Sequence, residues 1–232
     1  MLAGRPLVAS LARIPFFSGL DADALERVAA GTRTRRFRRG EVIFHAGDPG
    51  DALFVIVSGE VKIAVPSESG EEAILTTLRE GDVFGELALL DGAPRSATAA
   101  ALVATETVVL PRDRFRELVA TEPVIRDALL ASLAGELRRL TTHVEELHFL
   151  DMTGRLAARL VRLAAESGPS DDDGAIRLRA SLTQAELASM VGCTRQSVNK
   201  LLGQFSDDGL VRLDRDGIVV TDLDGLVGAS HR

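Results

Sequence analysis

The sequence predicts an α+β protein with three parts: a β-rich N-terminal domain, a long dimerisation helix and a C-terminal winged helix-turn-helix domain. Short apolar runs separated by glycine and proline fill the first half of the chain. Six aliphatic residues then recur at helical spacing, and two adjacent helical segments followed by a hairpin come last. We place the three parts at residues 1–122, 123–150 and 151–232.

Short strand-like runs characterise the N-terminal part. Each contains mainly Val, Ile, Leu, Phe or Thr and is bounded by Gly, Pro or Asp, which is typical of a β-sandwich or barrel. We expect turns at 48–51 and 58–60, where proline presets φ and glycine supplies a positive φ. A short helix capped by Asp21 should precede the strands. The predicted strands are 41–47, 52–59, 60–65, 73–78 and 105–111.

The segment 123–150 predicts one long helix. Its aliphatic residues recur at intervals of 3, 4, 3, 4 and 3, which is the seam pattern of a coiled coil. A single apolar stripe needs a partner, and packing on its own domain is one alternative. We favour a parallel coiled-coil homodimer. The stripe consists of Leu130, Leu133, Leu137, Leu140, Val144 and Leu147.

Two helices in close succession are expected in the C-terminal part. Thr183 and Glu186 form a capping box at the start of the first helix, and Gly192 ends it. Thr194 then caps a second helix that begins only two residues later. A helix, a tight turn containing glycine and another helix make a helix-turn-helix pattern.

The segments on either side complete a winged domain. Asp151 can cap a preceding helix over 152–166, so we expect a hinge at 149–151. The segment 210–221, LVRLDRDGIVVT, indicates a hairpin whose turn contains Asp216 and Gly217. A hairpin that follows a helix-turn-helix is interpreted as a wing.

The segment 84–98, FGELALLDGAPRSAT, brings together residue types suited to a nucleotide phosphate. Gly85 can let the backbone approach a ligand closely. The Glu86 carboxylate can accept hydrogen bonds from a ribose hydroxyl. Arg95 offers a fork of donors that suits phosphate, and the Ser96 hydroxyl lies beside it. We interpret the segment as a nucleotide-phosphate site; the plainer alternative is a surface Glu–Arg pair on a turn.

The helix that opens at Thr194 carries polar residues on its first two turns. In a recognition helix, residues at the N-terminal end reach base edges in the major groove. Arg195 suits guanine and Gln196 suits adenine, while Ser197 and Lys200 can contact a base or a phosphate. The alternative is a solvated polar face. The capped helix before it and the wing after it favour DNA.

Composition excludes several classes of protein. The net charge is −7, from 27 basic and 34 acidic residues, which disfavours non-specific adhesion to nucleic acid or to an anionic membrane. A lone cysteine, Cys193, fits a reducing compartment, and no apolar run is long enough to span a membrane. We find no nucleophile–base arrangement, metal-spaced cluster or Walker loop. We therefore expect a cytoplasmic protein without enzymatic activity, cofactor or metal.

Three segments resemble the CRP/FNR family of bacterial transcription regulators. The segment 85–98 is similar to the family's cyclic-nucleotide phosphate-binding cassette, and 150–164 to its hinge and first DNA-domain helix. The segment 182–202 looks like its helix-turn-helix. The resemblance implies a jelly-roll cyclic-nucleotide-binding domain, a dimerisation helix and a winged helix-turn-helix. It also implies palindromic double-stranded DNA and RNA polymerase as partners of a homodimer.

Resemblance to the cAMP receptor branch of the family implies roles for individual residues. Glu86 would bind the ribose hydroxyl, and Arg95 with Ser96 the cyclic phosphate. Two positions on the dimer helix that touch adenine in that branch fall on Leu140 and Thr141; Thr141 keeps a hydroxyl and Leu140 departs from the pattern. The residues predicted to bind the effector, cAMP or a related cyclic nucleotide, are Gly85, Glu86, Leu87, Arg95, Ser96 and Thr141.

Other effectors stay open at this point. A cyclic dinucleotide could use the same arginine, and a regulator with a vestigial or differently occupied pocket would need no ligand. An iron–sulfur sensor is excluded because the chain has only one cysteine. His45, His143 and His148 are interpreted as surface or packing residues rather than haem ligands.

The predicted DNA-binding residues match the family only in part. Arg195 corresponds to its guanine-reading arginine, Gln196 stands where the cAMP receptor branch has glutamate, and Lys200 replaces an arginine. Glutamate accepts from cytosine whereas glutamine favours adenine. We therefore expect a palindrome related to the operator of that branch but changed at the base pair read by residue 196. The predicted DNA-binding residues are Thr194, Arg195, Gln196, Ser197 and Lys200.

Overall fold

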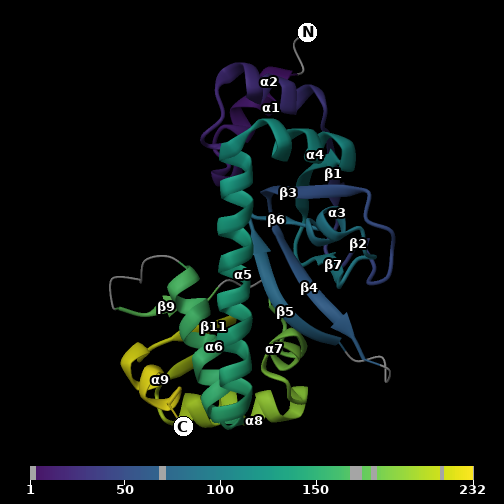
Figure 1. Cartoon of the computed structure of the whole chain (residues 1–232). Helices are drawn as coiled ribbons and strands as arrows, with labels where there is room; N and C mark the ends of the chain where they lie inside the picture. Colours follow the sequence, from purple (N-terminus) through teal and green to yellow (C-terminus); the bar gives the residue numbers. More distant parts are fainter. Residues whose placement is uncertain (1–3, 68–71, 168–173, 179–181, 215–216, 232) are drawn as a thin grey trace. The chain divides into compact units, whose positions relative to one another are not determined.

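The computed structural model describes residues 4–67, 72–167, 174–178, 182–214 and 217–231. The chain divides into two compact units, residues 1–137 and 138–232, and the division falls inside the long helix α5 (Pro123–Phe149; Figure 1). Each unit has its own hydrophobic core. Within the described residues, no helix is both long and apolar enough to cross a membrane.

Two four-stranded antiparallel sheets form the centre of the first unit, as the β-sandwich prediction requires (Figure 1). One has the order β1-β8-β3-β6 and the other the order β2-β7-β4-β5. The first sheet contains β1 (Arg33–Phe37), β3 (Ala52–Ser58), β6 (Val83–Phe84) and β8 (Thr105–Pro111). The second contains β2 (Val42–Phe44), β4 (Glu60–Pro66), β5 (Glu72–Arg79) and β7 (Thr98–Ala101).

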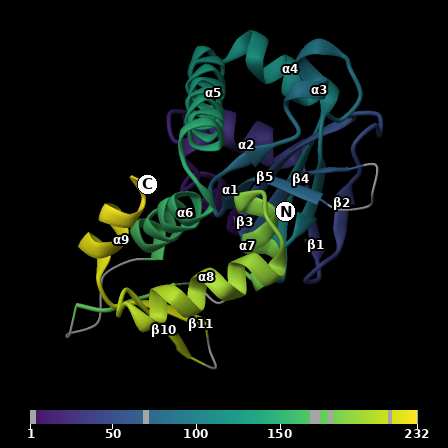
Figure 2. The same cartoon turned by 90° about the horizontal axis from the view of Figure 1, so that it is seen from below.

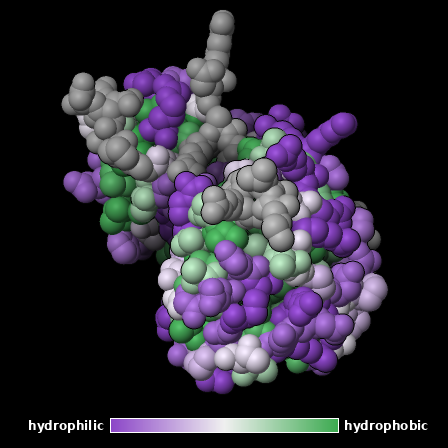
Figure 3. Space-filling view, turned by 90° about the horizontal axis from the view of Figure 1, so that it is seen from above, coloured by the Kyte–Doolittle hydropathy of each residue, from purple (hydrophilic) through white to green (hydrophobic). Residues whose placement is uncertain are grey.

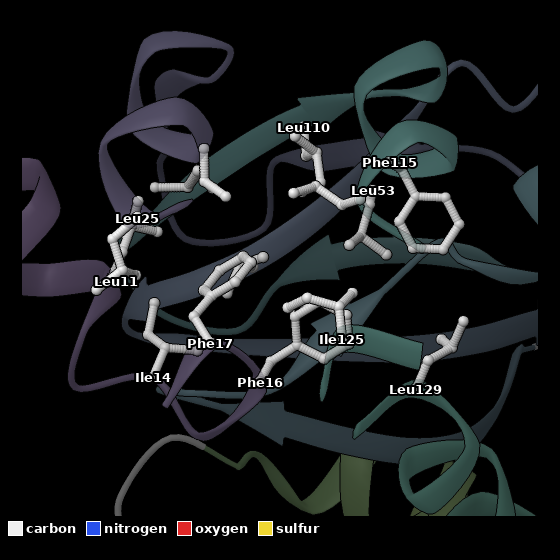
Figure 4. Close-up of a cluster of buried hydrophobic side chains, with 14 of the residues drawn as sticks. Leu11, Ile14, Phe16, Phe17, Leu25, Leu53, Leu110, Phe115, Ile125 and Leu129 are labelled. Atoms are coloured by element: carbon white, nitrogen blue, oxygen red, sulfur yellow. The ribbon is translucent and has the colours of Figure 1, made fainter. Parts of the chain in front are cut away.

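Helices cover one face of the first sheet and pack against apolar side chains of β3 and β8, while other apolar side chains of the same sheet pack against the second sheet. These helices are α1 (Gly4–Leu11), the 3-10 helix η1 (Pro15–Phe17), α2 (Ala22–Ala30), α4 (Arg112–Thr121) and the start of α5. Figure 4 shows their side chains meeting Leu53 of β3 and Leu110 of β8, and all of these residues are buried. Hydrophilic residues predominate on the surface seen in Figure 3, with small hydrophobic areas between them. Asp21 caps α2 as predicted, accepting from the Ala24 amide at 2.8 Å.

The turn predictions hold at one glycine and fail at another. Gly59 has φ +98°, the left-handed conformation expected at 58–60. The turn predicted at 48–51 lies instead at 45–48, where the Asp48 amide donates to the His45 carbonyl at 3.2 Å and Gly47 has φ +87°. Gly50 does not have a positive φ. Glycine is needed there because a Cβ would lie 2.3 Å from the Cβ of Ala88. Close packing, not conformational freedom, is therefore the reason for glycine at this position.

The predicted helix over 123–150 is present as α5, and its apolar stripe is mostly exposed. Ile125 and Leu129, near its start, are buried in the core of the first unit, and Leu133 packs against that core in part. The remaining stripe residues stay accessible, with Leu137 67% exposed. Packing against the core of the first unit thus accounts for Leu133 and not for the five stripe residues that stay exposed. The exposed five are Leu130, Leu137, Leu140, Val144 and Leu147.

The second unit contains the predicted helix-turn-helix and hairpin. Its helices are α6 (Met152–Ser167), α7 (Gln184–Val191), α8 (Arg195–Asp207) and α9 (Leu223–Ala229), and α9 packs beside α6 (Figure 2). Strands β10 (Val211–Asp214) and β11 (Gly217–Val220) pair in antiparallel register, and β9 (Ile176–Arg177) adds a third strand. The predicted turn residue Asp216 lies outside the described residues.

The predicted capping contacts are present in the second unit. The Thr183 hydroxyl accepts from the Glu186 amide at 3.2 Å, and the Glu186 carboxylate accepts from the Thr183 amide at 2.6 Å. Gly192 ends α7 in the left-handed conformation, with φ +73°. Asp151 accepts from the Gly154 amide at 2.8 Å at the start of α6. These local signals define the helix ends because they provide partners for otherwise unpaired backbone groups.

Candidate ligand site and DNA-binding helix

Arg95 is a charged residue placed almost entirely inside the first unit, with 4% of its surface exposed. Its Nη1 donates to the Gly85 carbonyl at 2.5 Å, and its Nη2 donates to the Ala52 carbonyl at 2.7 Å. The guanidinium lies over the Phe44 ring, 4.3 Å from the centroid. Its Nε is buried and has no hydrogen-bond partner among the described residues. One strong donor is therefore left unpaired, at a cost in free energy that an added acceptor would remove.

Backbone hydrogen bonds fix the position of Arg95 beside residues 47–48. Its amide donates to the Asp48 carbonyl at 2.8 Å, and its carbonyl accepts from the Gly47 amide at 2.8 Å. Burial lowers the pKa of the Arg95 guanidinium, and the carboxylates of Asp51 and Glu86 oppose this shift. Oδ1 of Asp51 lies 3.7 Å from Nη2 of Arg95. The Asp51 side chain is exposed, so this ion pair is weak. The arginine stays charged because its ordinary pKa is far above neutrality.

Glu86 stands at the start of the short helix α3 (Leu87–Asp91), and its carbonyl accepts from the amides of Leu89 and Leu90. Its side chain is half-buried. Burial raises the pKa of the Glu86 carboxyl; a backbone hydrogen bond lowers it, Glu136 of α5 raises it, and Arg95 lowers it. The site thus places a partly desolvated carboxyl group where it interacts electrostatically with the buried Arg95 guanidinium.

The structure gives Gly85 a role in addition to the ligand approach that the sequence suggested. It has φ +83°, and a Cβ would lie 2.6 Å from Nη1 of Arg95. The close approach that glycine permits is therefore that of the Arg95 side chain to the backbone.

The structure brings together five of the six predicted effector-binding residues. Leu87 and Ser96 are exposed beside buried Arg95, with Gly85 and Glu86 next to it in the same unit. Thr141 lies exposed on α5 in the second unit, so the structure does not join it to the other five. The five residues of the first unit are Gly85, Glu86, Leu87, Arg95 and Ser96.

Sequence reasoning missed the residues that support Arg95. Ala52 contributes only a backbone carbonyl, which no side-chain pattern reveals. Phe44 has the appearance of an ordinary strand residue. Arg112 donates its Nε to the Gly50 carbonyl at 3.1 Å and its Nη2 to the Ala88 carbonyl at 3.1 Å. It thereby joins α3 to the backbone that precedes β3, and its only sequence signal is its position directly after a strand.

The second helix of the helix-turn-helix presents a polar face. Arg195, Gln196 and Lys200 are exposed on α8. The opposite face is buried through Val198, Leu202 and Phe205. The Thr194 hydroxyl accepts from the Ser197 amide at 3.1 Å and lies 3.0 Å from the Ser197 hydroxyl. These two residues therefore both form the cap and stand at the helix end that would meet a nucleic acid.

The side chains that could bind a metal ion are scattered over the described part of the chain. Among the described residues, no group of three or more His, Cys, Asp or Glu could hold a metal ion. Cys193 is half-buried in the turn before α8, and burial raises the pKa of its thiol. Its amide donates to the Ala188 carbonyl at 3.1 Å. This is the setting of a packing residue.

Comparisons with known proteins agree with this arrangement. Residues 34–122 match the cyclic nucleotide-binding domain family, and residues 154–228 match the Crp-like helix-turn-helix domain family. A CRP-like cAMP-activated global transcriptional regulator of Mycobacterium tuberculosis is 38% identical over 88% of this chain and 91% of its own. The cAMP-activated global transcriptional regulator CRP of Escherichia coli is 32% identical over 81% of this chain and 89% of its own.

Solved structures show the same architecture. The c-di-GMP-responsive global regulator CLP of Xanthomonas campestris superposes with a TM-score of 0.77 at 27% identity, covering 86% of this chain and 99% of that one. A CRP/FNR-family regulator of Thermus thermophilus superposes with a TM-score of 0.70 at 29% identity, covering 86% and 99%. With a matching sensor domain, helix-turn-helix and relatives along most of its length, this chain belongs to the CRP/FNR family and is a DNA-binding transcription regulator.

Proposed function

We propose that this chain works as a homodimer whose DNA binding is controlled by a cyclic nucleotide, with cAMP as the first candidate. The observation that carries the proposal is the buried guanidinium of Arg95, whose Nε is unpaired and whose charge interacts with Glu86. A cyclic phosphate would supply the missing acceptor. The relatives in M. tuberculosis and E. coli are named as cAMP-activated regulators, which supports cAMP.

Binding would change the partners of both charged residues. Arg95 would direct part of its guanidinium to the phosphate, at the expense of its bonds to the Gly85 and Ala52 carbonyls. The Glu86 carboxylate would accept from the ribose hydroxyl, while Ser96 and the backbone near Leu87 would complete the phosphate contacts. Thr141 would contact the base from the dimer helix. Since Gly85 and Ala52 lie on different elements, ligand binding is coupled to the packing of both.

The exposed stripe of α5 supports the homodimer. Leu137, Leu140 and Val144 leave about half or more of their surface to solvent, on one helix and at heptad spacing. Large apolar side chains in a continuous stripe mark an interaction surface. A second copy of the same helix fits this stripe, and it places two recognition helices on one palindrome.

The DNA contacts proposed for α8 follow from its polar face. Arg195 would read guanine and Gln196 adenine, while Ser197 and Lys200 would contact a base or a phosphate. Thr194 would stand beside them at the same end of the helix. We propose that the regulator acts in the cytoplasm together with RNA polymerase and has no catalytic activity of its own.

One observation favours a second candidate, a regulator that needs no nucleotide. Two of the donor groups of Arg95 are already bonded to carbonyls, and Leu140 places an apolar side chain where the cAMP receptor branch has a polar one. In this alternative, Arg95 serves only to hold the sandwich together. A cyclic dinucleotide is a further possible effector, since CLP of X. campestris responds to c-di-GMP.

Calorimetric titration with cAMP, cGMP and c-di-GMP, followed by operator binding at fixed salt with and without each nucleotide, separates the candidates. We expect cAMP to bind and to raise operator affinity. Arg95→Gln should lose both effects. Arg114→Gln, which removes an exposed charge paired with Glu117, is the control and should keep them. Tight operator binding that no nucleotide changes would establish the alternative.

A further inference from the structure

An ion pair joins the end of α5 to α6 within the second unit. The guanidinium of Arg162 donates through Nη1 and Nη2 to the two carboxylate oxygens of Glu146, and Nη2 lies 3.0 Å from Oε2. The two residues are 16 positions apart, on opposite sides of the corner between the helices. The Glu146 side chain is 12% exposed and that of Arg162 39%. A bidentate pair with a mostly buried carboxylate fixes orientation more strictly than a fully exposed pair does.

The corner itself is held by the residues around it. The Leu150 amide donates to the Glu146 carbonyl at 3.1 Å, which continues the helical bonding of α5 to its end. Arg155 Nη1 donates to the Leu150 carbonyl at 3.3 Å, and Asp151 caps α6. The backbone groups at the corner therefore have partners, and Glu146 with Arg162 adds a side-chain tie one turn of α5 further back.

Helix α6 is the support on which the helix-turn-helix rests. Leu156 and Leu160 of α6 are fully buried in one core with Leu187 of α7 and with Val198 and Leu202 of α8. The end of α5 also reaches the turn before α8, since Leu147 Cδ2 lies 3.8 Å from the position of a Cβ on Gly192. The Glu146–Arg162 pair thus ties α5 to the element that carries the recognition helix.

The electrostatics of this region favour the pair. Burial lowers the pKa of the His143 imidazole; Glu146 raises it, and Arg162, Arg159 and Arg155 of α6 lower it. Three arginines of α6 thus face the same part of α5, and Glu146 supplies the carboxylate beside them. Replacing Glu146 by a neutral residue would leave the Arg162 guanidinium without the carboxylate that it contacts.

We infer that Glu146 and Arg162 are positioning residues that make the end of α5 and the recognition helix move as one body. The inference rests on the proposed function, because it concerns how a signal in α5 reaches DNA. With the pair intact, a shift of α5 carries α6, α7 and α8 with it. Without the pair, α6 can pivot about residues 150–151, and the shift of α5 is lost at the corner.

The test compares Glu146→Gln, Arg162→Gln and the charge-swapped double variant Glu146→Arg/Arg162→Glu with the wild type. The control is Arg177→Gln, which breaks an exposed 3.1 Å pair with Asp214 in the same unit. We measure cAMP affinity by calorimetry, and operator affinity with and without cAMP. Both single variants should bind cAMP within about twofold of wild type, while the cAMP-induced gain in operator affinity falls by about fivefold or more. The swapped variant should recover the gain only in part, because its new arginine on α5 would face Arg155 and Arg159. The control should retain the gain.

A gain that stays within twofold of wild type in both single variants would overturn the inference. If the wild type itself shows no nucleotide response, the proposed function fails. A measurement that needs no ligand then tests the inference about Glu146 and Arg162. Spin labels on exposed Glu145 and Asn199, in a Cys193→Ser background diluted with unlabelled chains, should give a narrow distance distribution. Glu146→Gln should broaden it, and an unchanged width would overturn the inference.

Discussion

Arg95 and Gly85 pack so closely that a Cβ on Gly85 would lie 2.6 Å from the Arg95 Nη1 atom, which donates to the Gly85 carbonyl at 2.5 Å. The residue before the ribose-binding candidate Glu86 is therefore in direct contact with the phosphate-binding candidate. A ligand that moves the Arg95 guanidinium must also disturb the backbone that carries Glu86. The two ends of the proposed site are coupled through this one contact.

Replacing Gly85 by alanine tests that contact. The substitution introduces both a left-handed alanine and an overlap with Arg95, whereas Gly92→Ala, with φ +78° and nothing within 4 Å, introduces only the first. We expect Gly92→Ala to lower the free energy of unfolding by about 1–2 kcal/mol. Gly85→Ala should lower it by about 1–3 kcal/mol more. Denaturant unfolding of the two variants measures the difference. Equal losses of free energy of unfolding would show that the Arg95 side chain can move away from the added methyl group without cost.

Glu86→Gln separates ligand binding from folding. The amide keeps the shape of the side chain but removes a half-buried charge, so the free energy of unfolding at neutral pH should not fall. Cyclic-nucleotide affinity should fall by about 10- to 150-fold, because a hydrogen bond to a charged group contributes about 1.5–3 kcal/mol. Calorimetry with cAMP and denaturant unfolding provide the two measurements. Unchanged nucleotide affinity would remove Glu86 from the site.

The raised pKa of Glu86 predicts a pH dependence of stability. The native state binds its proton more tightly than the unfolded state, whose pKa is near 4.5. Protonated Glu86 therefore makes its full contribution to the free energy of unfolding below about pH 4.5. That contribution is lost as the pH rises through the higher pKa of the native state. The stability of wild type relative to Glu86→Gln should fall across this interval. Glu136→Gln should shift the loss to lower pH, since Glu136 contributes to the elevation.

Leu137→Glu tests the dimer. Leu137 is 67% exposed within one chain, so the change should leave the fold of each chain intact. In a coiled-coil seam it would place two carboxylates in an apolar interface, weakening association by about 100-fold or more. Sedimentation measurements over a range of concentrations report the monomer–dimer equilibrium. Val227→Glu, on the exposed side of α9, is the matched control and should leave the dimer unchanged.

Gln196→Glu tests base recognition by α8. Glutamine suits adenine and glutamate suits the cytosine amino group, so the preferred base pair should change in both half-sites by about 1–3 kcal/mol each. Selection from a randomised palindrome, at one fixed salt concentration, would display the change. The positions read by Arg195 should keep their preference in the same experiment. An identical consensus for both proteins would mean that residue 196 does not read a base.

Several elements could not be recognised from the sequence. Strand β1 has four exposed residues, three of them arginine, and it exists because its backbone pairs along β8. Strand β7 is formed largely by alanine, which has little intrinsic preference for strands, yet it lies between β2 and β4. In both cases the neighbouring strands decide the conformation, and pairing partners are not encoded in the local pattern.

The sequence by itself determined the helix ends, the heptad stripe and the order of the three parts, because caps and periodicity act over a few residues. Thr183, Glu186 and Thr194 have the predicted contacts for that reason. Only the tertiary structure decided what Arg95 touches, why Gly50 and Gly85 must be glycine, and which carboxylate faces Arg162. Those contacts join segments distant in the chain, and burial and packing, rather than local preference, select them.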